Sequence, residues 1–541
     1  MKFDFFANNL EFKNQVKDLT KHFGLTDFTY NFLQKIYQEN ALRNTKKLMV
    51  DIDYPKSYNG KKIVFNVING IYGTGTFFTG AVAKSLQLRG HQPLILTCGG
   101  ALSMCTAGIT IESPKKPCKN CINYAKQFYD ILDIPHKTYF DYISKERPSE
   151  LASFTSDPKL KVILYKGIDA TTLAKNSADR YFEGKINKIG YDKIFSKELA
   201  NAIISVDVAG KLVEEEKPDI LVSQQQHFSA WGGITEYCKS KGIRIIEPAK
   251  GYNNNSVGFD INKTNKARFD EYYGRWRKRH KLTTEEGTEL WYYNCQREIG
   301  RSGDTALFNF DIDADMKSLI QDNQYKKTYV MFTNIPYDAG LHEVKRGFKD
   351  VYDWVDYTIE LFKNKPDCRL IIKVHPVEKV FRAQNTLSDY IKQNILSNNI
   401  KTIPADTRIS PYSLYHLIDV GIVYSGTLGI ELSLQGIPTI VAGNASYSKS
   451  GFTFDASTKE DYKALLSKNL KMSKQQQKMA SVYAYYYFIK TFIPINFFYN
   501  NNFLDVGWNI ESINQLAPGK DKYLDVVCDY IANGGVYQKW K

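Results

Sequence analysis

Short runs of apolar, β-branched residues alternate with longer helix-like segments along most of this 541-residue chain, in two separate series. A run such as Lys62–Ile68 (KIVFNVI), bounded by polar loops, is typical of a strand that is buried on both faces of a parallel sheet. Parallel strands need a crossover connection, usually a helix, so this alternation predicts doubly wound sheets. We therefore expect an α/β fold of two Rossmann-like domains that face a central cleft, with helical additions.

The two series also predict where the domains begin and end. Residues 251–325 are polar and lack a strand pattern, so they are expected to connect the domains. The C-terminal segment is expected to be helical, and a final helix often crosses back to the first domain in such proteins. The expected organisation is an N-terminal helical cap (1–58), a first Rossmann-like domain with a helical insertion on the acceptor side (59–300), a linker (301–325), a second Rossmann-like domain that binds a nucleotide (326–470) and C-terminal helices (471–541).

Small residues and one acidic residue follow the predicted strand VGIVY in the second domain. Ser425, Gly426, Thr427 and Gly429 open a helix, and a helix start offers unpaired N–H groups and the positive end of a dipole. Small residues let a phosphate approach such a backbone closely. Glu431, one turn further, is placed to accept hydrogen bonds from ribose hydroxyls. The alternative is that Ser or Thr merely caps the helix and Glu431 offsets its dipole.

A second motif, KVHPVE, closes the predicted strand RLIIKV. Pro376 ends the strand, so His375 is expected at the edge where ligands bind. There His375, together with Lys373, could donate a hydrogen bond or a positive charge to a departing phosphate. We also assign Pro376 and Glu378 to the donor site. A structural histidine is the alternative.

A third motif, FTNIPYDAG, follows the first strand of the second domain and places Asn334 and Asp338 near a strand end. Asn334 is expected to contact the donor and Asp338 to take part in catalysis, and an Asx-stabilised turn is the alternative. In the first domain, Gly73, Thr74 and Gly75 form a loop that is expected over phosphate or acceptor, although it lacks the full dinucleotide fingerprint.

His227 follows the predicted strand DILVS and is a candidate base for the acceptor. A merely structural role is the alternative for this histidine as well.

Cysteines cluster within one segment of the first domain. A C-x2-C pair with two more thiols nearby has the composition of a structural zinc or iron–sulfur site, whereas free buried thiols are the alternative. The four members are Cys98, Cys105, Cys118 and Cys121. Disulfides are not expected, because no secretion signal precedes them.

Together, the segments FTNIPYDA, DWVDYTIE, LIIKVHPVE, IPADTRISPYSL, GIVYSGTLGIELSLQGIPTIVAG and YSKSGFT resemble the capsule polysaccharide biosynthesis family, which is related to bacterial Kdo transferases of capsule assembly. The resemblance is good over about 330–460 and weaker over 62–300. In that family the His-Pro pair and the Ser/Thr–Gly–Glu helix start bind the nucleotide. By resemblance these elements are His375, Pro376, Ser425, Thr427, Gly429 and Glu431. The acidic residue that Kdo transferases carry in their N-terminal domain has no clear counterpart here, so the stereochemical outcome stays open.

The resemblance implies a glycosyltransferase of the two-Rossmann-domain (GT-B) kind, which moves a sugar from a CMP- or UDP-linked donor to a glycan or lipid-linked acceptor of surface polysaccharide. It implies no cofactor for catalysis. Three alternatives stay open: a transferase of polyol phosphate from a cytidine nucleotide, a sugar-nucleotide epimerase, and a non-catalytic glycan- or nucleotide-binding subunit of an assembly complex.

Charge and hydropathy bear on partners and location. The formal net charge is +14, but the basic residues are spread along the chain and accompany no nucleic-acid motif, so nucleic acid is not an expected partner. No run of about 20 apolar residues exists, which predicts no membrane-spanning helix and a cytoplasmic location. The segment Gly274–Lys281 (GRWRKRHK) surrounds Trp276 with basic residues. It suggests peripheral contact with the anionic inner face of the cell membrane or with an anionic acceptor, and a solvated helix face is the alternative.

Overall fold

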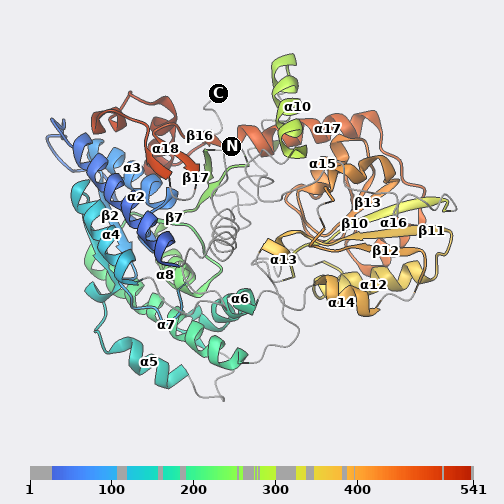
Figure 1. Cartoon of the computed structure of the whole chain (residues 1–541), viewed down its shortest axis with the longest axis horizontal. Coiled ribbons are helices and arrows are strands. Elements are labelled where there is room, and N and C mark those ends of the chain that lie inside the picture. Colours follow the sequence, from blue (N-terminus) through green and yellow to red (C-terminus); the bar gives the residue numbers. More distant parts are fainter. Residues whose placement is uncertain are drawn as a thin grey trace. The chain divides into compact units, whose positions relative to one another are not determined.

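The computed structural model of the chain contains two compact units (Figure 1). The first comprises residues 1–181, 189–261 and 492–541, and the second comprises 182–188 and 262–491. The structure describes residues 27–105, 118–155, 163–182, 190–252, 255–259, 273–274, 277, 281–299, 325–336, 346–380, 387–394, 397–407, 409–502 and 505–537.

The first unit is built on a five-stranded sheet in the order β3-β2-β1-β6-β7, and every neighbouring pair is parallel. The strands are β1 (Lys62–Ile68), β2 (Gln92–Thr97), β3 (His136–Thr138), β6 (Ile220–Ser223) and β7 (Arg244–Ile246). The helices are α2 (Asp27–Leu48), α3 (Thr74–Leu88), α4 (Cys118–Ile131), α5 (Arg147–Thr155), α6 (Ala170–Phe182), α7 (Tyr191–Glu216) and α8 (Ser229–Ser240), with a short turn η1 (Tyr139–Asp141) and a small hairpin β4 (Leu164–Tyr165) to β5 (Ile168–Asp169).

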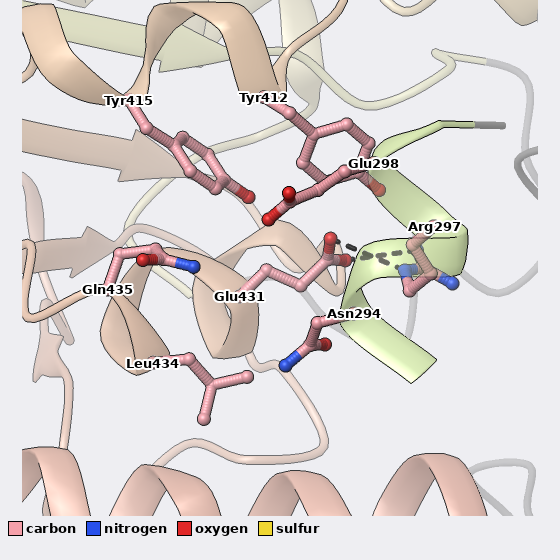
Figure 2. Close-up of a pocket in the computed structure, with 8 residues that line it drawn as sticks. All are labelled: Asn294, Arg297, Glu298, Tyr412, Tyr415, Glu431, Leu434 and Gln435. Atoms are coloured by element: carbon pink, nitrogen blue, oxygen red, sulfur yellow. Dashed lines mark hydrogen bonds and ion pairs between the residues drawn. The ribbon is translucent and has the colours of Figure 1, made fainter. Parts of the chain in front are cut away.

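The second unit repeats this plan with six strands in the order β12-β11-β10-β13-β14-β15, again all parallel. The strands are β10 (Lys327–Phe332), β11 (Cys368–Lys373), β12 (Ile400–Ile403), β13 (Val420–Val423), β14 (Thr439–Val441) and β15 (Phe454–Asp455). The helical elements are α10 (Thr284–Glu298), α12 (Val351–Lys363), α13 (Val377–Val380), α14 (Leu387–Asn394), η5 (Tyr412–Leu417), α15 (Leu428–Leu434), α16 (Lys459–Ser467), α17 (Lys474–Tyr485) and η6 (Tyr486–Lys490). Helix α10 carries Arg297, whose side chain points at Glu431 of α15 (Figure 2).

Local sequence explains these elements. In α12, Asp350 caps the helix by accepting from the N–H of Asp353 at 2.9 Å, and apolar residues at helical spacing face the sheet. Trp354 and Phe362 on that face are fully buried against strand residues such as Ile372. The alternation of strands and helices along most of both sheets, and the parallel pairing in them, confirm the predicted α/β class. The strand order is that of a doubly wound nucleotide-binding fold.

The C-terminal segment returns to the first unit rather than forming a helical appendage. It contains β16 (Ile493–Pro494), β17 (Phe498–Asn502), β18 (Asp505–Trp508), η7 (Ile513–Leu516) and α18 (Lys522–Asn533). Strand β16 pairs with β9 (Ser256–Phe259), which in turn pairs with β8 (Pro248–Lys250), and both pairings are antiparallel. Figure 1 shows the red α18 beside the blue α3, and the core of the first unit includes apolar residues from both.

Three sequence-based expectations therefore need correction. The segment 251–325 is not all connection, because β9 lies within it. The segment 459–541 is not all helical, since it contains β16, β17 and β18. The change of unit falls at 261/262 rather than near 300–330, because α10 packs within the second unit, on α17. The prediction that a final helix returns to the first domain is confirmed, because α18 belongs to the first unit.

Within the described residues, no helix has the length and hydropathy needed to cross a membrane.

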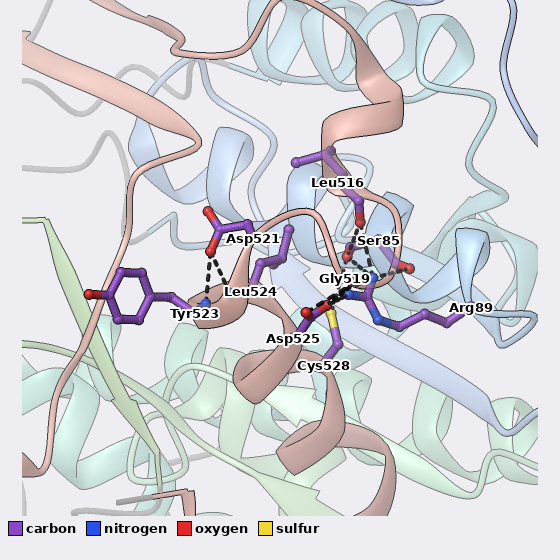
Figure 3. Close-up of polar contacts among 9 residues, drawn as sticks. All are labelled: Ser85, Arg89, Leu516, Gly519, Asp521, Tyr523, Leu524, Asp525 and Cys528. Carbon is purple, nitrogen blue, oxygen red and sulfur yellow. Dashed lines mark hydrogen bonds and ion pairs between the residues drawn. The ribbon is translucent and has the colours of Figure 1, made fainter. Parts of the chain in front are cut away.

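An arginine at the C-cap of α3 makes several contacts with the returning segment (Figure 3). Arg89 forms an ion pair with Asp525 of α18 and donates to the carbonyl oxygens of Ser85, at 2.9 Å, and Leu516, at 3.0 Å. The thiol of Cys528 also donates to the Ser85 hydroxyl, at 3.3 Å. Arg89 therefore contacts both η7 and α18 and joins them to the N-terminal half of this unit.

We predict that Arg89→Met lowers the free energy of unfolding of the first unit by roughly 2–3 kcal/mol, because it leaves Asp525 and the Leu516 carbonyl without their charged donor. Chemical denaturation followed by circular dichroism measures this loss. Arg43→Met, at an exposed position of α2, is the matched control and should change stability by less than about 0.5 kcal/mol. Equal effects of the two substitutions would contradict the role of Arg89.

Candidate functional site

The polar residues of the second unit gather where the strand order of its sheet reverses. Strand β10 is central, with β11 on one side and β13 on the other. The chain leaves β10 towards β11 and leaves β13 towards β14, so the connections run in opposite directions from the carboxyl ends of β10 and β13. Doubly wound sheets bind ligands in the crevice at such a point. Asn334 follows β10, His375 follows β11 and Ser425 follows β13, so all three predicted residues reach this edge.

Hydrogen bonds tie these loops together. The Asn334 amide donates to the Ser425 hydroxyl at 3.2 Å, and its oxygen accepts from the Ser425 N–H at 3.3 Å. The N–H of His375 donates to the hydroxyl of Thr333 at 3.1 Å. Three loops far apart in the sequence thus form one polar edge.

His375 is held in one tautomer. Its Nδ1 accepts from the N–H of Val377 at 3.2 Å, so in the neutral ring the proton is on Nε2, which is then a hydrogen-bond donor. Burial, and secondarily the charge of Lys373, lower the pKa of His375 to about 4. Of the two roles expected for this residue, donation of a hydrogen bond is therefore favoured over donation of a positive charge at neutral pH.

The neighbours of His375 in the motif KVHPVE have different surroundings. Lys373 ends β11 as a buried side chain, its pKa is lowered to about 8 by burial, and it donates to the Thr407 hydroxyl at 3.3 Å. Both oxygens of Glu378 accept from the N–H of Leu387, at 3.3 and 3.1 Å, and burial raises its pKa to about 7. These contacts make Glu378 the cap of α14, which argues for a structural role. Pro376 makes the turn into α13. Asp338 lies outside the described residues.

The two glycines at the start of α15, Gly426 and Gly429, have different surroundings. A side chain at Gly426 would meet nothing nearer than the Asn334 amide oxygen, at 3.9 Å, so the backbone there is open. At Gly429 the added carbon would stand 2.1 Å from the hydroxyl of Tyr447, which donates to the Gly426 carbonyl at 2.6 Å. Gly429 therefore makes room for Tyr447 rather than for a phosphate. Thr427 occupies the N-cap position, but its side chain makes no capping hydrogen bond.

Glu431 forms a buried ion pair with Arg297 (Figure 2). Their atoms are 3.0 Å apart from Nη2 to Oε1 and 3.4 Å from Nε to Oε2, and both side chains are at most 5% exposed. Arg297 also donates to the Tyr293 hydroxyl at 2.9 Å and stands 5.2 Å from the centre of the Phe488 ring. The predicted ribose-binding carboxylate is thus held by a cation that the sequence analysis did not identify.

A small cavity adjoins this pair. It is lined by Asn294, Arg297, Glu298, Tyr412, Tyr415, Glu431, Leu434 and Gln435 (Figure 2). Its volume of about 10 Å³ has room for about one water molecule. The buried Tyr415 hydroxyl has no hydrogen-bond partner among the described residues, and burial, then Glu431, raises the pKa of Glu298. Most residues that line the cavity carry polar groups, but a ribose fits beside Glu431 only if Arg297 moves.

In the first unit, the predicted glycine loop lies at the corresponding reversal of strand order, between β1 and β6. Gly73 precedes α3 with φ 155, in the region that glycine favours, and Thr74 has a buried hydroxyl without a partner among the described residues. A side chain at Gly75 would meet only the Gln224 amide, at 3.7 Å. The loop is therefore open next to the residues that follow β6. His227, half-buried, is two residues before α8, and its carbonyl accepts from Asn176 at 3.0 Å.

A buried carboxyl group of the first unit was missed by the sequence analysis. Glu198 of α7 accepts from the Asn201 amide at 3.1 Å, and the Ser229 hydroxyl at the start of α8 favours its charged form. Burial raises the pKa of Glu198 to about 7, while these donors oppose the shift. Asn201 also binds Ser103, which follows β2, so the group belongs to the carboxyl edge of the first sheet. No motif marks Glu198 within its long helix.

Two remaining expectations concern metal and membrane. Cys98, Cys105, Cys118 and Cys121 are all free thiols, and in the described part of the chain no group of three or more histidine, cysteine, aspartate or glutamate side chains could hold a metal ion. Of the segment Gly274–Lys281, Trp276 and most of the basic residues lie outside the described residues.

Comparisons with known proteins bear on the family. Residues 304–498 match the family model described as "Capsule polysaccharide biosynthesis protein", which confirms the resemblance for that segment. No curated protein matches the chain in sequence.

Several solved structures are similar in fold. The β-Kdo 2,4-transferase of Thermosulfurimonas dismutans KpsC shares 13% identity over 56% of this chain and 88% of its own, with a TM-score of 0.35. The β-Kdo 2,7-transferase of the same protein shares 12% identity over 51% of this chain and 79% of its own, with a TM-score of 0.30. The UDP-GlcNAc 2-epimerase of Neisseria meningitidis, bound to UDP-GlcNAc, shares 9% identity over 79% of this chain and 95% of its own, with a TM-score of 0.25. At these values the fold assignment depends on the strand order of this chain.

We predict that the imidazole of His375 titrates near pH 4 and carries its proton on Nε2 at neutral pH, which ¹⁵N NMR of the ring measures. Because the folded-state pKa lies below the unfolded value of 6.5, the unfolded chain binds the proton first as pH falls. The stability of wild type relative to His375→Gln should therefore decrease from about pH 6.5 towards pH 4. A ring that titrates near 6.5 would contradict this environment.

We also predict that Arg297→Met lowers the free energy of unfolding by about 3–5 kcal/mol, since it leaves the carboxylate of Glu431 buried without a cation. The double variant Arg297→Met/Glu431→Gln removes both charges and should recover most of this loss. A double-mutant cycle in denaturant measures the coupling. Additive effects of the two substitutions would show that the pair is not coupled.

Proposed function

We propose that this chain, whose residues 304–498 belong to the capsule polysaccharide biosynthesis family, is a glycosyltransferase that moves a sugar from a nucleotide donor to a glycan or lipid-linked acceptor. The observation that carries the proposal is the convergence of Asn334, His375 and Ser425 at the reversal of strand order in the second sheet. Doubly wound sheets place nucleotide phosphates at this position. Kdo transferases and a UDP-GlcNAc-bound epimerase among the similar structures agree with a nucleotide-sugar ligand.

The donor would bind with its phosphates over Ser425 and Gly426, where the backbone is open. The Nε2–H of His375 would donate to the leaving phosphate, and Lys373 would add positive charge behind it. These groups oppose charge that develops only as the sugar–phosphate bond breaks, so they lower the barrier without tightening donor binding much. Such a leaving group needs no metal ion.

Ribose recognition would involve Glu431, but only after Arg297 moves, because the present cavity holds about one water molecule. The ribose hydroxyls would replace the guanidinium as donors to the carboxylate. The released positive charge would then be available to the anionic nucleotide.

The first unit would bind the acceptor. Two groups are candidates to take the proton from its hydroxyl: His227, and Glu198 with its pKa of about 7. A base whose pKa is near the working pH transfers protons efficiently. We place the protein in the cytoplasm, at the inner face of the membrane, where lipid-linked acceptors are presented.

The proposal is tested by thermal-shift screening against UDP-, GDP-, CMP- and CDP-linked ligands, followed by donor-turnover assays with the ligand that stabilises the chain. Release of free sugar or transfer of sugar supports a glycosyltransferase. Release of a polyol phosphate would instead show a polyol-phosphate transferase, and binding without turnover would show a non-catalytic subunit.

We predict that His375→Ala reduces turnover by on the order of 10²–10³ with little change in KM, because the lost hydrogen bond acts mainly in the transition state. Glu431→Ala should mainly raise KM, since ribose contacts are the same in the ground and transition states. His416→Ala, at an exposed position of η5, is the control and should keep normal turnover. Near-normal turnover of the His375 variant would remove it from the mechanism.

A further inference from the structure

A tyrosine in the motif YSKSGFT contacts the backbone that follows β13. Tyr447 is only 1% exposed, and its hydroxyl donates to the carbonyl oxygen of Gly426 at 2.6 Å. The same oxygen accepts from the N–H of Gly429 at 3.2 Å. Two donors, one of them a side chain 21 residues further along the sequence, therefore fix the direction of this carbonyl group.

The ring of Tyr447 is held by two other buried rings. It stacks on Phe452, with the ring centres 6.0 Å apart, and meets the ring of Tyr483 of α17 edge-on at 6.4 Å. Phe452 and Tyr483 also contact each other, at 5.4 Å. Figure 1 shows α17 beside α15, and these two helices pack on each other. Because buried rings of this kind are closely packed, the core of the second unit sets where the Tyr447 hydroxyl lies.

The space for this hydroxyl comes from Gly429. A side-chain carbon added at Gly429 would stand 2.1 Å from the Tyr447 hydroxyl and 2.6 Å from Cζ of its ring, so the ring would have to move. The neighbouring rings of Phe452 and Tyr483 oppose such a movement. The glycine at position 429 is therefore explained by the hydrogen bond that Tyr447 makes.

The backbone after β13 is held from a second direction by Asn334, which follows β10. Asn334 binds both the N–H and the hydroxyl of Ser425, whereas Tyr447 binds the carbonyl of Gly426. A trans peptide group is planar, so the N–H of Thr427 points in the opposite direction to the Gly426 carbonyl. Since Tyr447 turns that carbonyl towards the three rings, it turns the N–H of Thr427 away from them.

Tyr462 gives a contrast within the same unit. It is also fully buried, and its hydroxyl lies 2.8 Å from the hydroxyl of Thr358. Tyr462 thereby joins α16 to α12, and neither of its partners is a loop that follows a strand. Packing of two helices accounts for Tyr462, whereas Tyr447 acts on the backbone of the candidate donor site.

We propose that Tyr447 is a positioning residue of the donor site, which fixes the peptide group between Gly426 and Thr427 so that its N–H is ready to donate to a phosphate oxygen of the nucleotide. This inference rests on the proposed function and adds to it a residue that touches neither substrate. Glycine allows its peptide groups many orientations, so Gly426 without Tyr447 would have to be ordered when the nucleotide binds. A group that is already ordered avoids that entropic cost.

The test compares Tyr447→Phe with Tyr462→Phe in the full chain. Each substitution keeps a buried ring and removes one hydrogen bond, so both should lower the melting temperature by a similar few degrees. Calorimetric titration uses the nucleotide (UDP, GDP, CMP or CDP) that stabilises the wild type. Tyr447→Phe should weaken its binding by about 5-fold to 10-fold, the factor that one hydrogen bond contributes, and Tyr462→Phe should bind it as the wild type does.

Turnover assays give a second measurement. Because the positioned N–H contacts the phosphate in the ground state as well as in the transition state, Tyr447→Phe should raise the donor KM by the same factor and change kcat by less than about 2-fold. His375→Ala, by contrast, is expected to act on kcat.

Three results would overturn the inference, and they differ in what they say of the proposed function. Equal nucleotide affinity of wild type and Tyr447→Phe would show that the hydroxyl does not position the donor, while the donor site itself would stand. Equal weakening in Tyr447→Phe and Tyr462→Phe would show a general effect of lost stability. A wild type that binds none of the four nucleotides would remove the donor site, and the proposed function with it.

Discussion

Parallel pairing is the constraint on which the rest of the structure depends. Each neighbouring pair in the five-stranded and six-stranded sheets is parallel, so successive strands must be joined by crossovers and their carboxyl ends lie along one edge. The loop after β10 therefore meets the loop after β13, and the loop after β1 meets the end of β2. Functional side chains that directly follow different strands are therefore brought to the same edge of the sheet.

Polar and charged groups near that edge of the second sheet are buried, which is energetically unfavourable unless they are paired. His375 is neutral, Lys373 and Glu378 are buried, and Glu431 is balanced by Arg297. A buried charge is tolerated when it is paired and hydrogen-bonded, and removing one partner is far more costly than removing both. If the proposed function holds, stability and ligand binding in the second unit depend on the same carboxylate, and a nucleotide that engages Glu431 must compensate for the interaction with Arg297.

Sequence patterns predicted most of the parallel strands, because buried β-branched runs such as KIVFNVI are typical of such strands. They missed the short β3 and β15 at the ends of the two sheets. They failed for β9 and for the hairpin of β17 and β18, where small or asparagine-rich stretches such as SVGF and FYNNN carry no clear alternation. Motif spacing brought Asn334, His375 and Ser425 to one edge. It could not reveal the partner of Glu431, since Arg297 precedes it by 134 residues and lies on an ordinary amphipathic helix. Long-range pairs of this kind are decided by packing.

The return of residues 492–541 to the first unit has a consequence for the order of folding. The apolar face of α3 is covered by Val527 and Ile531 of α18, which are synthesised more than 400 residues later. At about 5–20 residues per second, a ribosome needs roughly 20–90 seconds to make the intervening chain. The unit whose synthesis begins first is thus the last to have all of its residues. During that interval its unfinished core needs protection from aggregation, while the second unit already has nearly all of its own residues.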